Sequence, residues 1–179
     1  MVNSIQQFLK NGTVKIQETM LNFWEDPSRT AEMVYGITSS VTELGLSIIA
    51  EEFEYADALI RQSDQRKKHW YIVRRDENTL LTSLGSVKFK RTLFKNKEDG
   101  HSEYLLDRII NITPHERMTE DAVAKMLEEA TESSYRKGGE KACITADAVS
   151  AQTAMNKIHE LSFPAVKNLD KKRKAEYLY

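Results

Sequence analysis

The sequence predicts an α+β protein with a long helical hairpin, a small antiparallel sheet and a C-terminal helix-turn-helix, in that order. Residues 4–62 place apolar side chains three and four positions apart, the spacing of amphipathic helices. Residues 70–106 change to β-prone runs between turn signals, and residues 118–163 return to helical spacing. The expected units are a helical hairpin at 1–62, a basic sheet at 63–111, a helix-turn-helix unit at 112–164, and a linker with the start of a strand at 165–179.

The hairpin is expected to consist of two helices of unequal length. The first covers residues 4–24, and Gly12 weakens its middle because glycine costs about 1 kcal/mol in a helix. Asp26-Pro27 then caps and starts the second helix, which runs without a breaker to about Arg61. Its length makes it a candidate homodimer contact, and an intramolecular hairpin is the simpler alternative. Four acids of this helix are expected to form a solvated face: Glu51, Glu52, Glu54 and Asp57.

The middle of the chain is expected to form a sheet of three or four antiparallel strands. A polar joint at Ser63–Lys68 precedes strands at 70–73, 79–82, 87–94 and 101–106, with turns at Leu84–Ser86 and Lys97–Gly100. Val87 and Phe89 should point inward, and Lys88 and Lys90 outward. A lysine-rich face fits a phosphate backbone, but lysines also protect exposed sheet edges from aggregation, and the pattern leaves both interpretations open.

The last unit is expected to hold three helices. Thr119 caps the first, Arg136-Lys137 close it near its negative end, and Gly138-Gly139 stop it. A short second helix is expected at Lys141–Ile144, and Ser150 opens a third that ends at Phe163-Pro164. The outward face of the third helix is polar: Gln152, Thr153, Asn156, Lys157 and His159. This outline fits a helix-turn-helix, and an ordinary three-helix core is the alternative.

The net charge of −1 hides a basic centre. Residues 1–60 carry three basic and nine acidic side chains, whereas residues 61–100 carry eleven basic and five acidic ones. This asymmetry indicates nucleic acid as the partner to test, rather than a small-molecule substrate.

Several classes of protein are disfavoured by what the sequence lacks. The single cysteine, Cys143, allows neither an internal disulfide nor a Cys-based zinc site, and the four histidines lack ligand spacing. There is no signal peptide and no apolar run of about 18 residues, so we expect a cytoplasmic protein that does not contact a membrane. No phosphate-binding loop or nucleophile motif is present.

Four blocks of the sequence are distinctive: Leu80–Arg91 (LLTSLGSVKFKR), Tyr104–Asp107 (YLLD), Glu132–Glu140 (ESSYRKGGE) and Val149–Asn156 (VSAQTAMN). Together they resemble the N-terminal part of a bacterial insertion-sequence transposase family that was long catalogued as an uncharacterised protein family. The resemblance covers essentially the whole chain. It implies an element-end-binding region followed by an RNase-H-like catalytic domain, whose carboxylates hold two divalent ions.

No residue of this chain matches a catalytic position of that family, and the sequence ends at Tyr179, in what resembles the first catalytic strand. The resemblance therefore implies a truncated recognition fragment without enzyme activity or cofactor, the divalent metal belonging to the missing domain. The expected partner is double-stranded DNA, with the helix opened by Ser150 in the major groove. The candidate DNA-binding residues are Ser150, Gln152, Thr153, Asn156 and Lys157 on that helix, with Arg136, Lys137, Lys88, Lys90 and Arg91 on the phosphate backbone. A stand-alone helix-turn-helix transcriptional regulator and an inactive pseudogene product are the alternatives.

Overall fold

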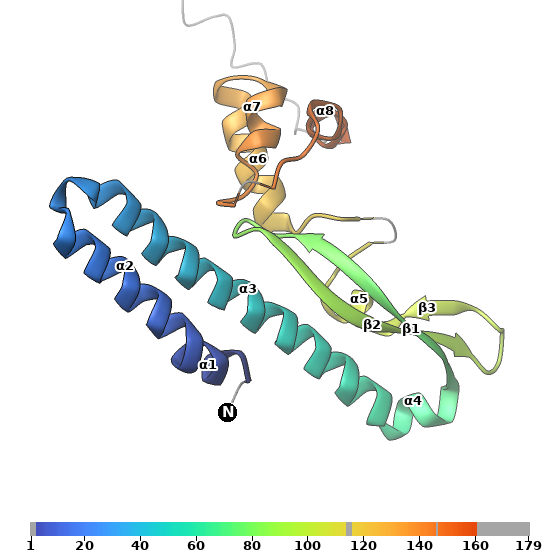
Figure 1. Cartoon of the computed structure of the whole chain (residues 1–179). Helices are drawn as coiled ribbons and strands as arrows, with labels where there is room; N and C mark the ends of the chain where they lie inside the picture. The colour runs from blue at the N-terminus through green and yellow to red at the C-terminus, as the bar shows by residue number, and fades with distance from the viewer. Residues whose placement is uncertain (1–2, 114–115, 146, 161–179) are drawn as a thin grey trace, which may run out of the picture.

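The computed structural model describes residues 3–113, 116–145 and 147–160 (Figure 1). These residues form helices and one three-stranded antiparallel sheet, with a long helix near the N-terminus, so the predicted α+β composition is confirmed. In chain order the elements are α1 (Asn3–Gln7), the π-helical η1 (Phe8–Gly12), α2 (Thr13–Glu25), the 3₁₀ turn η2 (Pro27–Arg29), α3 (Thr30–Gln62), α4 (Asp64–His69), β1 (Trp70–Leu81), β2 (Ser86–Asn96), β3 (Ser102–Tyr104), α5 (Leu105–Ile109), α6 (Glu120–Glu132), α7 (Tyr135–Glu140) and α8 (Ala151–Glu160).

The N-terminal helices form the predicted hairpin, in which α3 turns back along α1 and α2 (Figure 1). The first helical segment is continuous but takes π-helical geometry at Phe8–Gly12, where glycine was expected to weaken it. Asp26 caps η2 as predicted, because its carboxylate accepts the Ser28 N–H at 3.1 Å and Pro27 follows it. The second helix then runs 33 residues without a break.

Small and polar side chains bring the two arms of the hairpin close together. A Cβ atom at Gly36 would lie 2.8 Å from the Thr19 Cγ2 atom, so α2 and α3 touch at this point. Nearer the N-terminus, the Glu51 carboxylate accepts hydrogen bonds from the Ser4 N–H at 2.7 Å and the Ser4 hydroxyl at 2.6 Å. Glu51 therefore joins α1 to α3 while its side chain stays partly exposed, so it has a structural role in addition to the predicted place on a solvated face.

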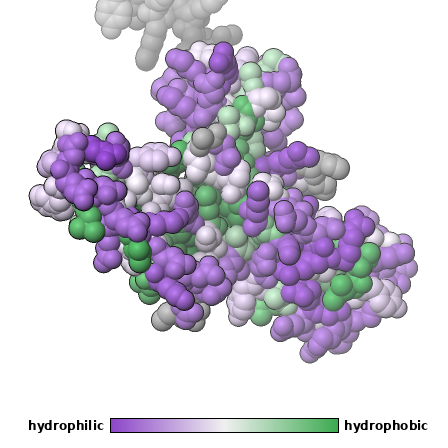
Figure 2. Space-filling model, in the orientation of Figure 1, coloured by the Kyte–Doolittle hydropathy of each residue, from purple (hydrophilic) through white to green (hydrophobic). Residues whose placement is uncertain are grey.

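By length and composition alone, the stretch Pro27–Gln62 could cross a membrane. The sequence pattern did not indicate such a stretch because small polar residues interrupt it, among them Ser39 and Ser40. Core helices of soluble proteins and N-terminal signal sequences share this property, so it does not place α3 in a membrane. Figure 2 shows hydrophobic residues exposed among the hydrophilic ones on the surface of the helical hairpin.

The sheet has the order β1-β2-β3, and its first two strands form a long antiparallel hairpin. The expected break at residues 74–78 is wrong, because this polar stretch continues β1 and pairs with residues 89–93 of β2. The irregularity is confined to a register shift between Ile72 and Arg74. The last strand is shorter than predicted: the chain turns into α5 at Leu105, where Leu105 and Leu106 are buried.

The second half of α3 covers the sheet through an apolar cluster. Leu80, Val87, Phe89, Leu106 and Ile112 are buried in it, and Leu46, Ile49 and Phe53 of α3 pack against them. The rings of Phe53 and Phe89 meet edge to face, with centroids 5.0 Å apart. The predicted alternation of strand β2 is confirmed here, because Val87 and Phe89 are buried whereas Lys88 and Lys90 are exposed.

Two acids of α3 also bind the backbone of β2. β3 pairs only with Leu93–Lys95, so the N–H groups of Lys90 and Thr92 have no strand partner on that edge. Glu54 accepts the Lys90 N–H at 2.9 Å, and the fully buried Asp57 accepts the Thr92 N–H at 2.8 Å. The prediction of a solvated face is therefore wrong for Asp57, whereas the Glu54 side chain stays 39% exposed while it accepts this hydrogen bond; both acids take the place of a strand partner.

The C-terminal helices α6, α7 and α8 pack together at the turn of the β1–β2 hairpin (Figure 1). Met118, Ala122, Met126, Ala142 and Ala154 form their buried core. α6 begins after Thr119 as predicted, although the Thr119 hydroxyl donates to the Leu81 carbonyl rather than capping the helix.

Two predictions for the C-terminal helices are wrong: the end of α6 at Gly138-Gly139 and the position of the short second helix at Lys141–Ile144. α6 ends at Glu132, and Ser134 caps the new helix α7 by accepting the Lys137 N–H at 3.3 Å. Gly138 and Gly139 therefore lie within α7 instead of stopping α6. A Cβ at Gly138 would lie 2.6 Å from the Ala130 Cβ, so glycine permits the close contact of the two helices.

The segment expected to be the second helix, Lys141–Ile144, is non-helical. Ten residues, 141–150, connect α7 to α8, whereas a helix-turn-helix has a turn of about three or four residues. The C-terminal helices α6, α7 and α8 thus pack together, and their assignment as a helix-turn-helix stays a prediction. The predicted end of the last helix at Phe163-Pro164 and the predicted strand near Tyr179 lie outside the described residues.

Candidate nucleic-acid interface

α8 presents a polar face to solvent and an apolar face to the other helices. Ser150 caps it as predicted, its hydroxyl accepting the Thr153 N–H at 3.1 Å. Ala154 is fully buried, whereas Gln152, Thr153 and Asn156 are exposed. The Gln152 Nε2 donates to the Asn156 Oδ1 at 2.9 Å, so the two amides lie side by side, one turn apart. An exposed pair of amides offers both donors and acceptors to an external partner.

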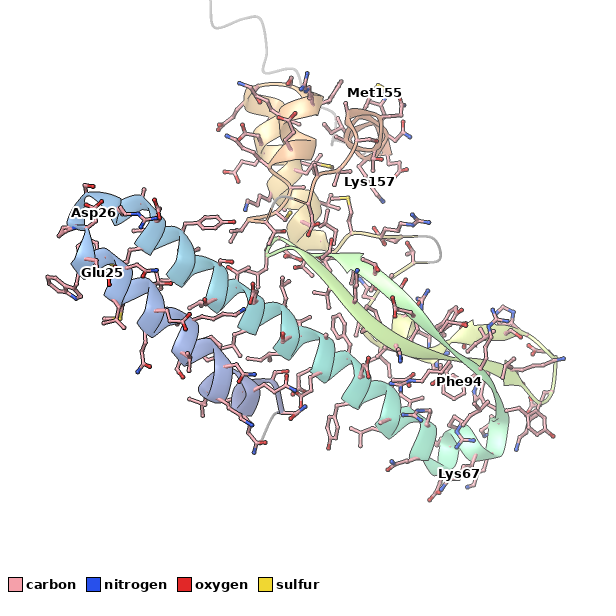
Figure 3. The ribbon with its side chains drawn as sticks, in the orientation of Figure 1. Glu25, Asp26, Lys67, Phe94, Met155 and Lys157 are labelled. Atoms are coloured by element: carbon pink, nitrogen blue, oxygen red, sulfur yellow. The ribbon has the colours of Figure 1, made fainter. Side chains whose placement is uncertain are left out.

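Lys157, on the same helix, is engaged within the protein. Its ammonium lies 3.3 Å from a carboxylate oxygen of Glu116 and 3.3 Å from one of Glu160, and only 28% of its side chain is exposed. The contact with Glu116 ties α8 to the segment that precedes α6. Lys157 therefore positions the helix, and its charge is offset by these two carboxylates instead of facing outward as predicted (Figure 3).

The start of α7 lies beside the C-terminal end of α8. The Tyr135 and His159 rings meet edge to face, with centroids 6.4 Å apart. The neighbouring Arg136 and Lys137 are exposed; Arg136 pairs with Glu140 at 2.9 Å within its own helix. Exposed pairs of this kind contribute little to stability, so Glu140 holds the Arg136 guanidinium only weakly.

The three predicted residues of β2 have different environments. Lys88 and Lys90 are exposed, as expected of an outward face. Arg91 instead forms an ion pair with Asp107 and lies 3.9 Å above the Tyr104 ring. Burial raises the pKa of Asp107, and the Arg91 guanidinium opposes this. Arg91 thus belongs to a contact between β2, β3 and α5, which the alternation of the strand did not reveal.

Two aspartates fasten the three-helix unit to the tip of the β1–β2 hairpin. Asp121 of α6 accepts the Ser83 N–H at 2.8 Å, and Asp147 accepts the Ser86 N–H at 3.0 Å. Burial opposes charge on Asp121, but its hydrogen bonds outweigh this and lower its pKa to about 2. Hydrogen bonds from Ser86 and Thr145 lower the pKa of Asp147. Sequence reasoning missed both roles, since only their partners in space distinguish these aspartates from other exposed acids.

Gly85 also belongs to this contact between the hairpin tip and the three-helix unit. It adopts a φ of +150°, and a Cβ there would lie 2.5 Å from the Thr145 Oγ1 atom. The turn can therefore pass directly beneath the loop that leads to α8. As a result, the turn of the β1–β2 hairpin is held in a fixed position against the loop that leads to α8.

A hollow of about 660 Å³ lies between the sheet and the start of α8. Its lining includes Thr79 and Ser86 from the strands, Arg117 from the segment before α6, and Ser150 and Thr153 at the start of α8. The structure thus brings the hairpin tip and the N-terminal turn of α8 to one cavity. Lys88 does not line the hollow, but its charge helps to lower the pKa of Asp147, after the hydrogen bonds from Ser86 and Thr145.

Among residues 3–113, 116–145 and 147–160, no three His, Cys, Asp or Glu side chains converge to hold a metal ion. The region combines an exposed polar helix, exposed lysines on a strand, and carboxylates that accept backbone N–H groups.

These features define a small α+β protein with a three-helix unit mounted on a β-hairpin. Residues 26–179 match the model of the uncharacterised protein family UPF0236, and the chain belongs to this family. No solved structure matches the chain.

Relatives of the chain occur in Caldanaerobacter subterraneus subsp. tengcongensis. One UPF0236 protein of this bacterium is 32% identical over 179 residues, which cover 97% of this chain and 38% of the relative. A second is 32% identical over 176 residues, covering 98% of this chain and 37% of that relative. The chain therefore spans little more than a third of the length of these curated relatives.

Proposed function

We propose that this chain is the DNA-binding part of an insertion-sequence transposase and that it recognises the ends of the element as duplex DNA. The observation that carries the proposal is the exposed Gln152–Asn156 amide pair on a capped helix whose opposite face is buried. An Asn or Gln amide can bind the N6 and N7 edge of adenine in the major groove through one donor and one acceptor. In the proposed complex α8 enters that groove.

The positions of the basic residues support this arrangement. Arg136 and Lys137 follow Tyr135, whose ring meets His159 near the C-terminal end of α8, and Lys88 is an exposed residue of β2, two residues from Ser86, which binds the Asp147 carboxylate. Contacts of Arg and Lys with phosphates fix the register of a protein on DNA, while base-edge contacts give specificity. Lys157 would hold α8 in place through Glu116.

The names of the relatives provide independent support. One joins eleven locus designations of a single genome, and another joins four. A protein encoded many times in one genome is what a mobile element would produce. The long connection between α7 and α8 departs from a standard helix-turn-helix, so we propose a variant of it with an extended turn.

Under this proposal catalysis belongs to the remainder of a protein as long as the relatives, with divalent ions bound there. This chain would act in the cytoplasm by binding alone and would require no cofactor.

The test is to replace the two amides. Gln152→Ala or Asn156→Ala should weaken binding to the element end by roughly 1–3 kcal/mol and leave random duplex little changed, because the substitution removes base contacts and keeps phosphate contacts. Gln17→Ala, an exposed glutamine of α2, is the matched control. Fluorescence anisotropy on both duplexes measures the difference.

Equal losses on both duplexes would assign the amides to positioning, and no loss on either would refute major-groove binding by α8. Footprints on promoters rather than on element ends would favour the alternative, a stand-alone regulator.

We also propose that the N-terminal hairpin pairs with that of a second copy. Val34, Val41 and Tyr55 are each more than half exposed, and with Ile48 they recur every seven residues along α3. Apolar side chains repeated every seven residues can pack against the same repeat on a second copy of the helix. Sedimentation velocity should show a dimer that Val34→Glu with Val41→Glu converts to a folded monomer. A monomeric wild-type protein at tens of micromolar would refute this pairing.

A further inference from the structure

A second basic surface lies at the end of the sheet opposite to α8. We call it the basic corner, and it consists of Arg66, Lys67, Lys68, Tyr71, Lys95 and Lys97. It combines α4, the beginning of β1 and the end of β2. In Figure 3, Lys67 marks this corner and Lys157 marks α8, at opposite ends of the molecule.

Charge at the corner is unevenly balanced. The corner carries five Lys or Arg side chains, and three acids lie within three residues of them in the chain: Asp64, which pairs with Lys67 at 3.2 Å, Glu98 and Asp99. Lys68 and Lys95 are exposed, and neither has an ion pair or side-chain hydrogen bond to another described residue. The two acids of the turn after β2 make one contact each: a Glu98 oxygen lies 3.6 Å from His69 Nδ1, and Asp99 accepts the His101 N–H at 2.9 Å.

An aromatic ring lies among these lysines. Tyr71 is 61% exposed, and the Lys97 ammonium lies 4.9 Å from the centre of its ring. The Lys97 N–H donates to the His69 carbonyl at 2.9 Å, which ties the turn after β2 to the end of α4. The corner is thus a connected surface, whose ammonium groups and tyrosine hydroxyl suit phosphate oxygens.

The length of β2 sets the distance between Lys88, the candidate DNA-binding lysine near the hairpin turn, and the basic corner. Lys88 and Lys95 are both exposed, each next to a buried phenylalanine (Phe89 and Phe94), and they are seven residues apart on β2, so at about 3.3 Å per residue their backbone positions are roughly 23 Å apart. Duplex DNA rises about 3.4 Å per base pair, so the same distance spans about seven base pairs.

We propose that the basic corner is a second contact with duplex DNA, binding phosphates about seven base pairs from the region read by α8. This inference rests on the proposed function and extends it, because it makes recognition bipartite. Protection of a sheet edge by lysines is the competing role for the same residues.

The experiment measures the salt dependence of binding to a mixed-sequence duplex about four helical turns long (~40 base pairs). Removing one phosphate contact lowers the slope of log affinity against log salt by about 0.9 on duplex DNA. Lys68→Ala with Lys95→Ala should therefore lower the slope by about 2 units and weaken binding at low salt. Lys10→Ala with Lys15→Ala removes the same charge from the acidic hairpin and should leave the slope unchanged.

The outcomes separate the two proposals. If the wild-type protein binds no duplex, the proposed function fails. If the wild-type protein binds and the corner variant retains its slope, or if both variants lower the slope equally, only the second contact is overturned. Increased aggregation of the corner variant with an unchanged slope would assign the lysines to edge protection.

Discussion

Replacing Asp57 should be among the most damaging single changes in this protein. Its side chain is fully buried between α3 and β2. One carboxylate oxygen accepts the Thr92 N–H at 2.8 Å, and the other accepts the Thr92 hydroxyl at 2.7 Å. The second oxygen also lies 3.2 Å from Arg61 Nε and 4.0 Å from Arg75 Nε.

The expected cost follows from the groups that Asp57→Ala leaves behind. The Thr92 N–H and hydroxyl lose a charged acceptor, and hydrogen bonds to charged groups contribute about 1.5–3 kcal/mol each. Two guanidinium groups also lose their nearby counter-charge. Removing one partner of a buried charged contact costs about 3–5 kcal/mol in other proteins, and we expect a loss in the free energy of unfolding of that size. Asp57→Asn keeps one oxygen acceptor and should cost less, about 1–3 kcal/mol.

Urea denaturation followed by circular dichroism measures these differences, provided that the m-value is unchanged. Glu52→Ala, an exposed acid on the same helix, is the control and should lie within about 0.5 kcal/mol of wild type. A loss below about 1 kcal/mol for Asp57→Ala would refute the argument that this carboxylate replaces a strand partner.

Two further predictions concern Asp121, which binds the tip of the β1–β2 hairpin, and the lysines Lys88 and Lys90 of β2. The pKa of Asp121 is depressed from 3.8 to about 2 in the folded protein, so its stabilising effect is present above pH 4 and is lost as the pH falls through 2. Asp121→Asn should cost about 1 kcal/mol at pH 7, after allowance for solvent screening, and the cost should fall steadily below pH 4 and vanish below pH 2; urea melts across this range that show a constant difference would contradict the assignment. Lys88→Ala and Lys90→Ala should each weaken binding to any duplex and lower the salt slope by about 0.9 for each phosphate that the lysine binds, and an unchanged slope would mean that these lysines only protect the sheet.

The sequence alone determined the features that depend on neighbours along the chain. The helical period of residues 30–62 predicted α3, and Asp26 and Ser150 predicted helix starts, because a cap needs a hydrogen bond only two or three residues away. The alternation of Val87 and Phe89 with lysines likewise predicted which face of β2 is buried, since strand geometry sets that order.

The tertiary structure decided the role of side chains whose partners lie far away in the chain. Asp57 reads like its exposed neighbour Glu52 until Thr92, 35 residues later, comes within hydrogen-bonding distance. Gly138 reads as a helix stop until Ala130 of another helix packs against it. The reason is physical: burial and ion pairing depend on which elements pack together, and the local pattern that sets secondary structure does not contain this information.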